Sequence, residues 1–188
     1  MHNWKKEILT IPNLLSLFRF LLIPVYTVLF LNAREPSDYW WAAGILAIST
    51  LTDFIDGKVA RPFNMITNLG KILDPLADKA TQFTLLVCLV LRHKALWIVM
   101  LLFVAKEGFM LVMGLINLRR RKMLDGALMS GKVCTAVLFA SMILLVLLPD
   151  ISSGAVHVLV ALCVAVILLA FADYIRAYFG KDKKFNDI

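Results

Sequence analysis

Residues 52–79 read TDFIDGKVARPFNMITNLGKILDPLADK and place four aspartates close together in an otherwise apolar chain. They are Asp53, Asp56, Asp74 and Asp78. A carboxylate in apolar surroundings is costly unless another group pairs with it. The stretch also separates two apolar runs, so it predicts a polar segment that joins two buried helices. Its carboxylates are expected to pair with another group.

The composition indicates a membrane protein with anionic partners. The chain has 188 residues, of which 61% are apolar and 18% charged, and a mean hydropathy of +0.82. These values are high for a soluble domain. The net charge of +7 favours lipid headgroups or phosphate substrates. The pattern of basic and aromatic residues that typifies a nucleic-acid surface is missing, so no nucleic-acid partner is expected.

Six apolar stretches are long enough to cross a bilayer, which takes roughly 20 residues per helix. Backbone groups in lipid must be satisfied within the segment, so each stretch is expected to be a helix. The sequence therefore predicts an all-α, polytopic membrane fold with six transmembrane helices in a single domain over 1–188. The predicted spans are 12–32, 39–57, 73–92, 95–118, 127–148 and 154–177.

The two ends of the chain are expected to lie outside the bilayer core. Residues 1–11 place Trp4, Ile8 and Leu9 against Lys5 and Lys6, which favours a short interfacial helix; a basic tail is the alternative. Residues 178–188 are expected to form a cytoplasmic tail.

The links between the spans predict the orientation. Arg34 in the 33–38 link is balanced by two acids, the 92–94 link carries Arg92 and Lys94, and the 149–153 link has no base. The other side collects most of the lysines and arginines. By the positive-inside rule, both termini and the aspartate segment face the cytoplasm.

The aspartate spacing predicts a metal site. Asp53 and Asp56 are three residues apart and Asp74 and Asp78 four apart, so each pair shares one helix face. One pair ends the second span and the other opens the third, so both reach the same membrane level. Four facing carboxylates would repel, and oxygen ligands suit two Mg²⁺ or Mn²⁺ ions. For Asp74, which precedes a proline, a helix N-cap is the alternative.

The residues between the pairs fit a phosphate ligand. Gly57 allows close approach to the backbone, Ala60 is small, and Arg61 offers a planar fork to a phosphate. Gly70 precedes the third span. Asn13, at the mouth of the first span, is expected either to contact a nucleotide or to cap its helix.

The segment from Asp53 to Asp78 resembles the signature of the CDP-alcohol phosphotransferase family, DxxDGxxARx8GxxxDxxxD. All eight fixed positions are present at the right spacing over 26 residues. The resemblance implies a membrane enzyme, usually a homodimer, with its active site at the cytoplasmic surface. Such an enzyme transfers a phosphatidyl group from a CDP-linked donor to an alcohol and releases CMP.

The resemblance also implies roles for individual residues. All four aspartates would bind two metal ions, and Asp78 would be the general base. The set expected to line the CDP-diacylglycerol site is Asn13, Gly57, Ala60, Arg61, Thr67 and Gly70.

The acceptor is predicted from further local similarity. Residues 10–24, 70–79 and 130–136 resemble bacterial phosphatidylglycerophosphate synthases, which implies glycerol 3-phosphate and a bacterial cell membrane. The bases expected to bind this anion are Arg119, Lys132 and Arg176. An alternative for Arg119 is that it only anchors the topology, and the same alternative applies to Lys132. Span four departs from that subfamily by reading Lys106-Glu107, so a cardiolipin synthase that uses phosphatidylglycerol remains an alternative.

Two charges lie deep in predicted spans. Arg19 and Glu107 fall at depths that allow an ion pair between the first and fourth spans. Lys106, the neighbour of Glu107, is expected to point elsewhere.

A magnesium transporter or channel is the alternative from another functional class. The aspartates cluster at one face instead of lining the depth of the bilayer, which favours the enzyme.

Overall fold

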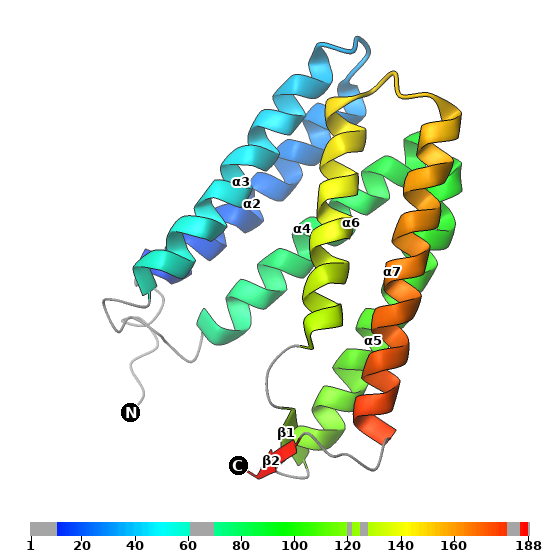
Figure 1. Cartoon of the computed structure of the whole chain (residues 1–188). Coiled ribbons are helices and arrows are strands. Elements are labelled where there is room, and N and C mark those ends of the chain that lie inside the picture. Colours follow the sequence, from blue (N-terminus) through cyan, green and yellow to red (C-terminus); the bar gives the residue numbers. More distant parts are fainter. Residues whose placement is uncertain (1–10, 61–69, 120–121, 125–127, 180–184, 188) are drawn as a thin grey trace. The chain divides into compact units, whose positions relative to one another are not determined.

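The computed structural model describes residues 11–60, 70–119, 122–124, 128–179 and 185–187 (Figure 1). Six α-helices and one short 3₁₀ helix, η1 (Lys94–Leu96), make up most of this part. The α-helices are α2 (Ile11–Asn32), α3 (Asp38–Ala60), α4 (Gly70–Arg92), α5 (Trp97–Arg119), α6 (Met129–Leu147) and α7 (Ser153–Phe179). Each of the six predicted apolar spans thus falls on one α-helix. The interfacial helix predicted within residues 1–11 lies almost wholly outside the described residues.

The helices have the character of a membrane protein. Among the described residues, α2, α5, α6 and α7 are long and apolar enough to cross a bilayer. Large apolar side chains such as Leu21, Leu111 and Leu169 are 65–68% exposed, as lipid-facing residues are. α3 and α4 have 23 residues each, but both carry several ionisable residues. The count of six spans therefore stays a prediction, with four supported by composition and length.

One feature was not predicted from the sequence. β1 (Lys122–Leu124), in the link after α5, pairs antiparallel with β2 (Phe185–Asp187), which follows α7. Met123 lies opposite Asn186 in this short ladder. The predicted tail at 178–188 therefore begins as the end of α7 and includes a strand. Three-residue strands carry too little periodicity to be seen in a sequence.

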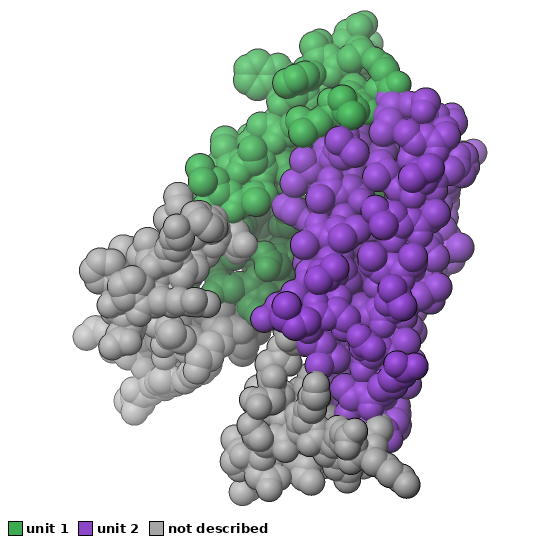
Figure 2. Space-filling view, viewed as in Figure 1, with its two compact units in different colours: residues 1–89, 146–150 green, residues 90–145, 151–188 purple. Residues whose placement is uncertain are grey.

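The chain divides into two compact units, coloured separately in Figure 2. Unit 1 comprises residues 1–89 and 146–150, and unit 2 comprises residues 90–145 and 151–188. The prediction of a single domain over 1–188 is not tested by this division.

Unit 1 is built on an antiparallel pair of helices, α2 and α3, which lie side by side in Figure 1. Near their link, the ring of Phe30 packs edge-on against Tyr39 at a centroid distance of 5.2 Å, and Tyr26 lies 5.8 Å from Phe30. Ala42 and Leu46 of α3 are buried in the same core. Because the pair is antiparallel, the last turns of α3 return to the end where α2 begins.

The link between these helices is fixed by an acidic side chain. Asp38 accepts hydrogen bonds from the backbone N–H groups of Arg34 and Glu35, at 2.9 and 3.0 Å. The bond from Glu35, and then that from Arg34, hold the pKa of Asp38 below its usual value. A carboxyl with a lowered pKa stabilises the fold above its unfolded pKa and loses that contribution as the pH falls.

Unit 2 packs α5 against α7. The ring of Phe109 meets Phe171 and Tyr178 at centroid distances of 5.3 and 5.8 Å, both close to edge-on. At one end of this unit, residues 92–95 line a common cavity with Ile151, Ser153, Val156 and His157. The β1–β2 ladder follows the opposite ends of α5 and α7. This order agrees with the predicted topology, in which alternate links lie on the same membrane face.

The contact between α6 and α7 depends on a glycine. A Cβ atom on Gly131 would lie 2.5 Å from the hydroxyl oxygen of Tyr174 and 3.0 Å from its Cε2. Tyr174 is only 3% exposed, so its ring has little room to move away.

We expect Gly131→Ala to destabilise the protein by about 1–3 kcal/mol, because overpacking forces the ring or the helix to shift. Thermal unfolding of the purified protein in detergent measures the effect. Gly108→Ala is the matched control, since a Cβ there meets nothing within 4 Å. Adding Tyr174→Phe should recover part of the loss, and an equal loss at Gly108 would contradict the explanation.

Candidate functional site

The first half of α2 carries a polar face that is fully buried. Asn13, Ser16 and Arg19 are spaced three residues apart, and their exposed fractions are 0%, 0% and 2%. Residues at this spacing follow one side of a helix. A buried guanidinium inside an apolar helix requires a partner of opposite charge.

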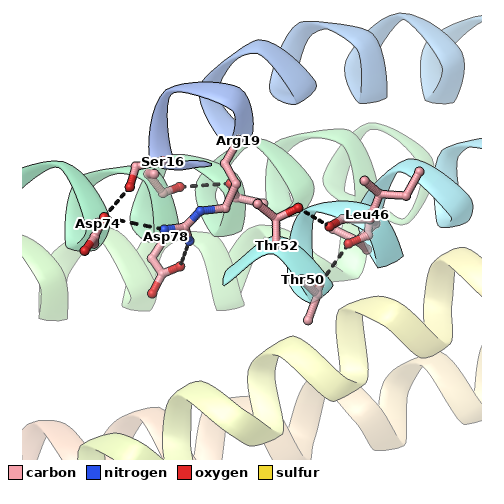
Figure 3. Close-up of polar contacts among 10 residues, drawn as sticks. Ser16, Arg19, Leu46, Thr50, Thr52, Asp74 and Asp78 are labelled. Atoms are coloured by element: carbon pink, nitrogen blue, oxygen red, sulfur yellow. Dashed lines mark hydrogen bonds and ion pairs between the residues drawn. The ribbon is translucent and has the colours of Figure 1, made fainter. Parts of the chain in front are cut away.

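The partners of this face are two of the predicted site aspartates, which lie near the start of α4 (Figure 3). The Oγ of Ser16 donates a hydrogen bond to Oδ1 of Asp74. Nη1 of Arg19 donates to Oδ1 of Asp78 at 2.7 Å, and Nη2 lies 3.9 Å from Oδ1 of Asp74. One guanidinium therefore faces both carboxylates.

These contacts fix the direction of the two helices. Ser16 pairs with Asp74 and Arg19 pairs with Asp78, so the contacts advance together along both chains. α2 and α4 therefore run parallel, as the first and third spans of the predicted topology should. The end of α3 returns toward the start of α2, and the convergence of all three helix ends at one site stays a prediction.

The charge balance of this site favours additional cations. Two carboxylates face one guanidinium, and Asp74 and Asp78 remain 43% and 49% exposed. Each carboxylate has two oxygens and about four lone-pair positions, of which Ser16 and Arg19 use a part. The outward oxygens of a half-exposed pair on one helix face are suitable ligands for a hard divalent cation.

The other predicted metal and lipid-site residues have less defined positions. Asp53, Asp56, Gly57 and Ala60 belong to the last turns of α3, but their side chains are not among those described. Gly70 is the first residue of α4, and Arg61 and Thr67 lie outside the described residues. The side chains that are described include no group of three or more His, Cys, Asp or Glu able to hold a metal. The four-aspartate metal site therefore stays a prediction.

The predicted acceptor residues all belong to unit 2. Arg119 is the last residue of α5, Lys132 lies in the first turn of α6, and Arg176 lies near the end of α7; all three are exposed. The contact of Gly131 with Tyr174 places the turns that carry Lys132 and Arg176 next to each other. Their function as acceptor ligands stays a prediction.

The prediction for Lys106 was wrong. Its Nζ forms an ion pair with Oε1 of the adjacent Glu107 at 2.7 Å and lies 6.0 Å from the ring centroid of Tyr174. Adjacent helical residues diverge at Cβ, but the four-carbon stem of lysine is long enough to return to its neighbour. Lys106 is 2% exposed, and at such a site pairing outweighs the cost of bending the stem.

The contacts of Arg19 add a role that the sequence prediction lacked. The residue was expected to pair with Glu107, and the structure gives it Asp74 and Asp78 as partners. The Arg19–Glu107 pair joins residues of different units and stays a prediction. Ser16 was not singled out at all. The signal that would have found it is the run of polar residues at 13, 16 and 19 on an otherwise apolar helix.

Comparison with known proteins assigns the chain to a family. The sequence profile described as CDP-alcohol phosphatidyltransferase matches residues 9–172. A cardiolipin synthase (CMP-forming) of Streptomyces coelicolor is 40% identical over 110 residues, 57% of this chain and 51% of that protein. A CDP-diacylglycerol–glycerol-3-phosphate 3-phosphatidyltransferase of Pseudomonas fluorescens is 40% identical over 90 residues, 48% of this chain and 46% of that protein. The chain thus spans about half the length of these two relatives.

A longer match comes from Aquifex aeolicus. Its CDP-diacylglycerol–glycerol-3-phosphate 3-phosphatidyltransferase is 36% identical over 138 residues, which is 73% of this chain and 74% of that protein. The profile covers α2 to α6 and most of α7, and it includes the whole aspartate segment. On these matches, the chain belongs to the CDP-alcohol phosphatidyltransferase family.

Proposed function

We propose that this protein transfers the phosphatidyl group of CDP-diacylglycerol to glycerol 3-phosphate and releases CMP. The observation that carries the proposal is the pair Asp74 and Asp78, which Ser16 and Arg19 fix on one face at the start of α4. These two aspartates complete the signature that begins at Asp53. Family membership favours this function over the transporter alternative.

The residues present fit a divalent metal centre. Asp53, Asp56, Asp74 and Asp78 would hold two Mg²⁺ or Mn²⁺ ions, since carboxylate oxygens are the ligands these ions prefer. Bound there, the ions would neutralise charge on the diphosphate of the donor. Arg19 compensates only part of the negative charge of Asp74 and Asp78, which leaves these carboxylates able to bind metal.

The reaction then needs a base and a positioned donor. Asp78 accepts the proton of the acceptor hydroxyl, and the hydroxyl oxygen attacks the phosphorus that carries diacylglycerol. The bond from that phosphorus to the bridging oxygen breaks, and CMP leaves with this oxygen. Arg19 holds Asp78 in place through its 2.7 Å hydrogen bond, so it acts as a positioning residue.

The donor site follows from the signature. Gly57, Ala60 and Gly70 leave room for the nucleotide, and Arg61 pairs with phosphate. Asn13 and Thr67 complete this site. The acyl chains remain in the bilayer, and the site faces the cytoplasm, where most of the basic residues are expected.

The acceptor assignment rests on charge and on similarity. Arg119, Lys132 and Arg176 are exposed bases that suit the phosphate of glycerol 3-phosphate. A cardiolipin synthase is the second candidate, because the Streptomyces coelicolor relative of that name matches over 110 residues. A homodimer is expected from the family resemblance.

We expect Asp78→Asn to reduce CMP release by at least about a thousandfold, because the amide accepts no proton from the acceptor and binds metal poorly. Radiolabelled CDP-diacylglycerol with Mn²⁺ measures the reaction. Asp150→Asn is the matched control, since Asp150 lies in the α6–α7 link. Substantial turnover by a well-folded Asp78→Asn protein would exclude the proposed base.

The acceptor is tested by supplying glycerol 3-phosphate, phosphatidylglycerol, inositol phosphate and serine in parallel. We expect glycerol 3-phosphate to give the fastest CMP release. Lys132→Gln and Arg176→Gln should raise the KM for it about tenfold each, because each removes a charge-assisted hydrogen bond. Faster reaction with phosphatidylglycerol would identify a cardiolipin synthase instead.

We expect Arg19→Gln to destabilise the metal-free protein by about 1–3 kcal/mol, because two carboxylates lose their shared cation; their exposure to solvent limits the loss. Thermal unfolding in EDTA measures it. Mn²⁺ should restore most of the lost stability, since a metal ion replaces the missing positive charge. Arg34→Gln serves as control on an exposed arginine, and an equal loss with and without Mn²⁺ would argue against a shared charge site.

A further inference from the structure

Unit 2 contains a polar cavity at one end. It has a volume of about 280 Å³ and lies where the α4–α5 link meets the start of α7. Four of its eight lining residues are basic and none is acidic. The eight lining residues are Arg92, His93, Lys94, Ala95, Ile151, Ser153, Val156 and His157.

The position of these bases is unusual for a membrane protein. The links at 92–94 and 149–153 are predicted to face away from the cytoplasm, the side on which lysine and arginine are depleted. The 33–38 link, on the same predicted side, balances Arg34 with Glu35 and Asp38. Arg92 and Lys94 are gathered with two histidines around one cavity, and Asp150, the neighbour of Ile151 in its wall, does not line it. Such an arrangement favours an anionic ligand.

His93 adds a hydrogen-bonding group to the wall. Its Nε2 atom is buried and has no hydrogen-bond partner among the described residues. Burial, and then the charge of Arg92, lower the pKa of His93 below its usual value. A nearby negative charge would favour the protonated ring, and so it would offset both the burial and the charge of Arg92.

The start of α7 supports the same kind of ligand. Ser152 caps this 27-residue helix: its hydroxyl accepts a hydrogen bond from the N–H of Ala155 at 3.3 Å. His157 donates from Nδ1 to the carbonyl of Ser153 at 2.6 Å, which holds its ring at the cavity. The positive end of a long helix dipole adds to the field of Arg92 and Lys94.

The apolar part of the lining indicates where the ligand comes from. Ala95, Ile151 and Val156 share the wall with the bases. The cavity lies at the ends of two apolar spans, residues 94–117 and 153–179. A phosphodiester at a membrane surface has one face toward water and one toward acyl chains, and so matches this wall better than a free ion does.

We propose that this cavity binds the headgroup of an anionic phospholipid from the leaflet that the 92–94 and 149–153 links are predicted to face. Arg92 and Lys94 pair with the phosphate, and His93 donates a hydrogen bond to it. Ile151 and Val156 contact the glycerol and the first methylenes of the lipid. The site is independent of the proposed transfer reaction.

The test uses the full-length protein in nanodiscs that contain phosphatidylcholine with a small fraction of phosphatidylglycerol. Native mass spectrometry counts the lipids retained after release. We expect the wild type to retain phosphatidylglycerol preferentially. Arg92→Gln with Lys94→Gln should reduce that preference about fivefold for each base removed, the factor that corresponds to about 1 kcal/mol per charge at a membrane surface.

Two further variants make the result specific. Arg34→Gln removes an exposed base from another link on the same predicted face and should leave the preference unchanged. Ile151→Trp keeps every basic residue but fills the cavity, so it should lose the bound lipid. Circular dichroism checks that each variant is folded.

The outcomes separate the possibilities. If the double variant retains as much phosphatidylglycerol as the wild type, the proposed site is wrong. If Arg34→Gln loses as much phosphatidylglycerol as the double variant, the preference comes from general surface charge and not from this cavity. Inorganic phosphate at millimolar concentration is the remaining arm. If it displaces the lipid, or stabilises the lipid-free protein through the same two bases, the ligand is a soluble phosphate and the lipid assignment is wrong.

Discussion

The buried guanidinium of Arg19 is the constraint on which the rest of unit 1 depends. At 2% exposure it cannot be satisfied by water, and its partners are Asp78 at 2.7 Å and Asp74 at 3.9 Å. A buried charge that loses its partner is far more costly than the pair itself. α2 and α4 are thereby held parallel and in register, and the two carboxylates are held at one level.

The same contact serves stability and the proposed metal site. Carboxylates that bind metal have to stay partly open, and an open, like-charged pair is unfavourable without a compensating cation. Arg19 approaches from the buried side and leaves the exposed side of Asp74 and Asp78 accessible. In unit 2, Lys106 and Glu107 solve a similar problem within one helix, where a long side chain bends to its neighbour.

Much of the architecture could be predicted from the sequence, because apolar length alone identifies a membrane helix. All six predicted spans coincide with α-helices, and the family resemblance carried by the aspartate segment was confirmed. What failed depended on side-chain reach. The Arg19–Glu107 pair stays a prediction, and depth along the helix alone did not reveal the contacts of Arg19 with Asp74 and Asp78. The prediction for Lys106 used the direction of its Cα–Cβ bond, but the flexible side chain of lysine can bend back to its neighbour. The β1–β2 ladder pairs residues 61 to 65 positions apart, beyond any local pattern.

The separation of Arg19 from Asp78 along the chain also bears on how the protein enters the membrane. The two residues are 59 positions apart, so the ribosome delivers the arginine well before its carboxylates. Until α4 emerges, the first helix must keep a cation near the headgroups by snorkelling or remain beside the insertion machinery. Stable seating of α2 is therefore coupled to synthesis of α4.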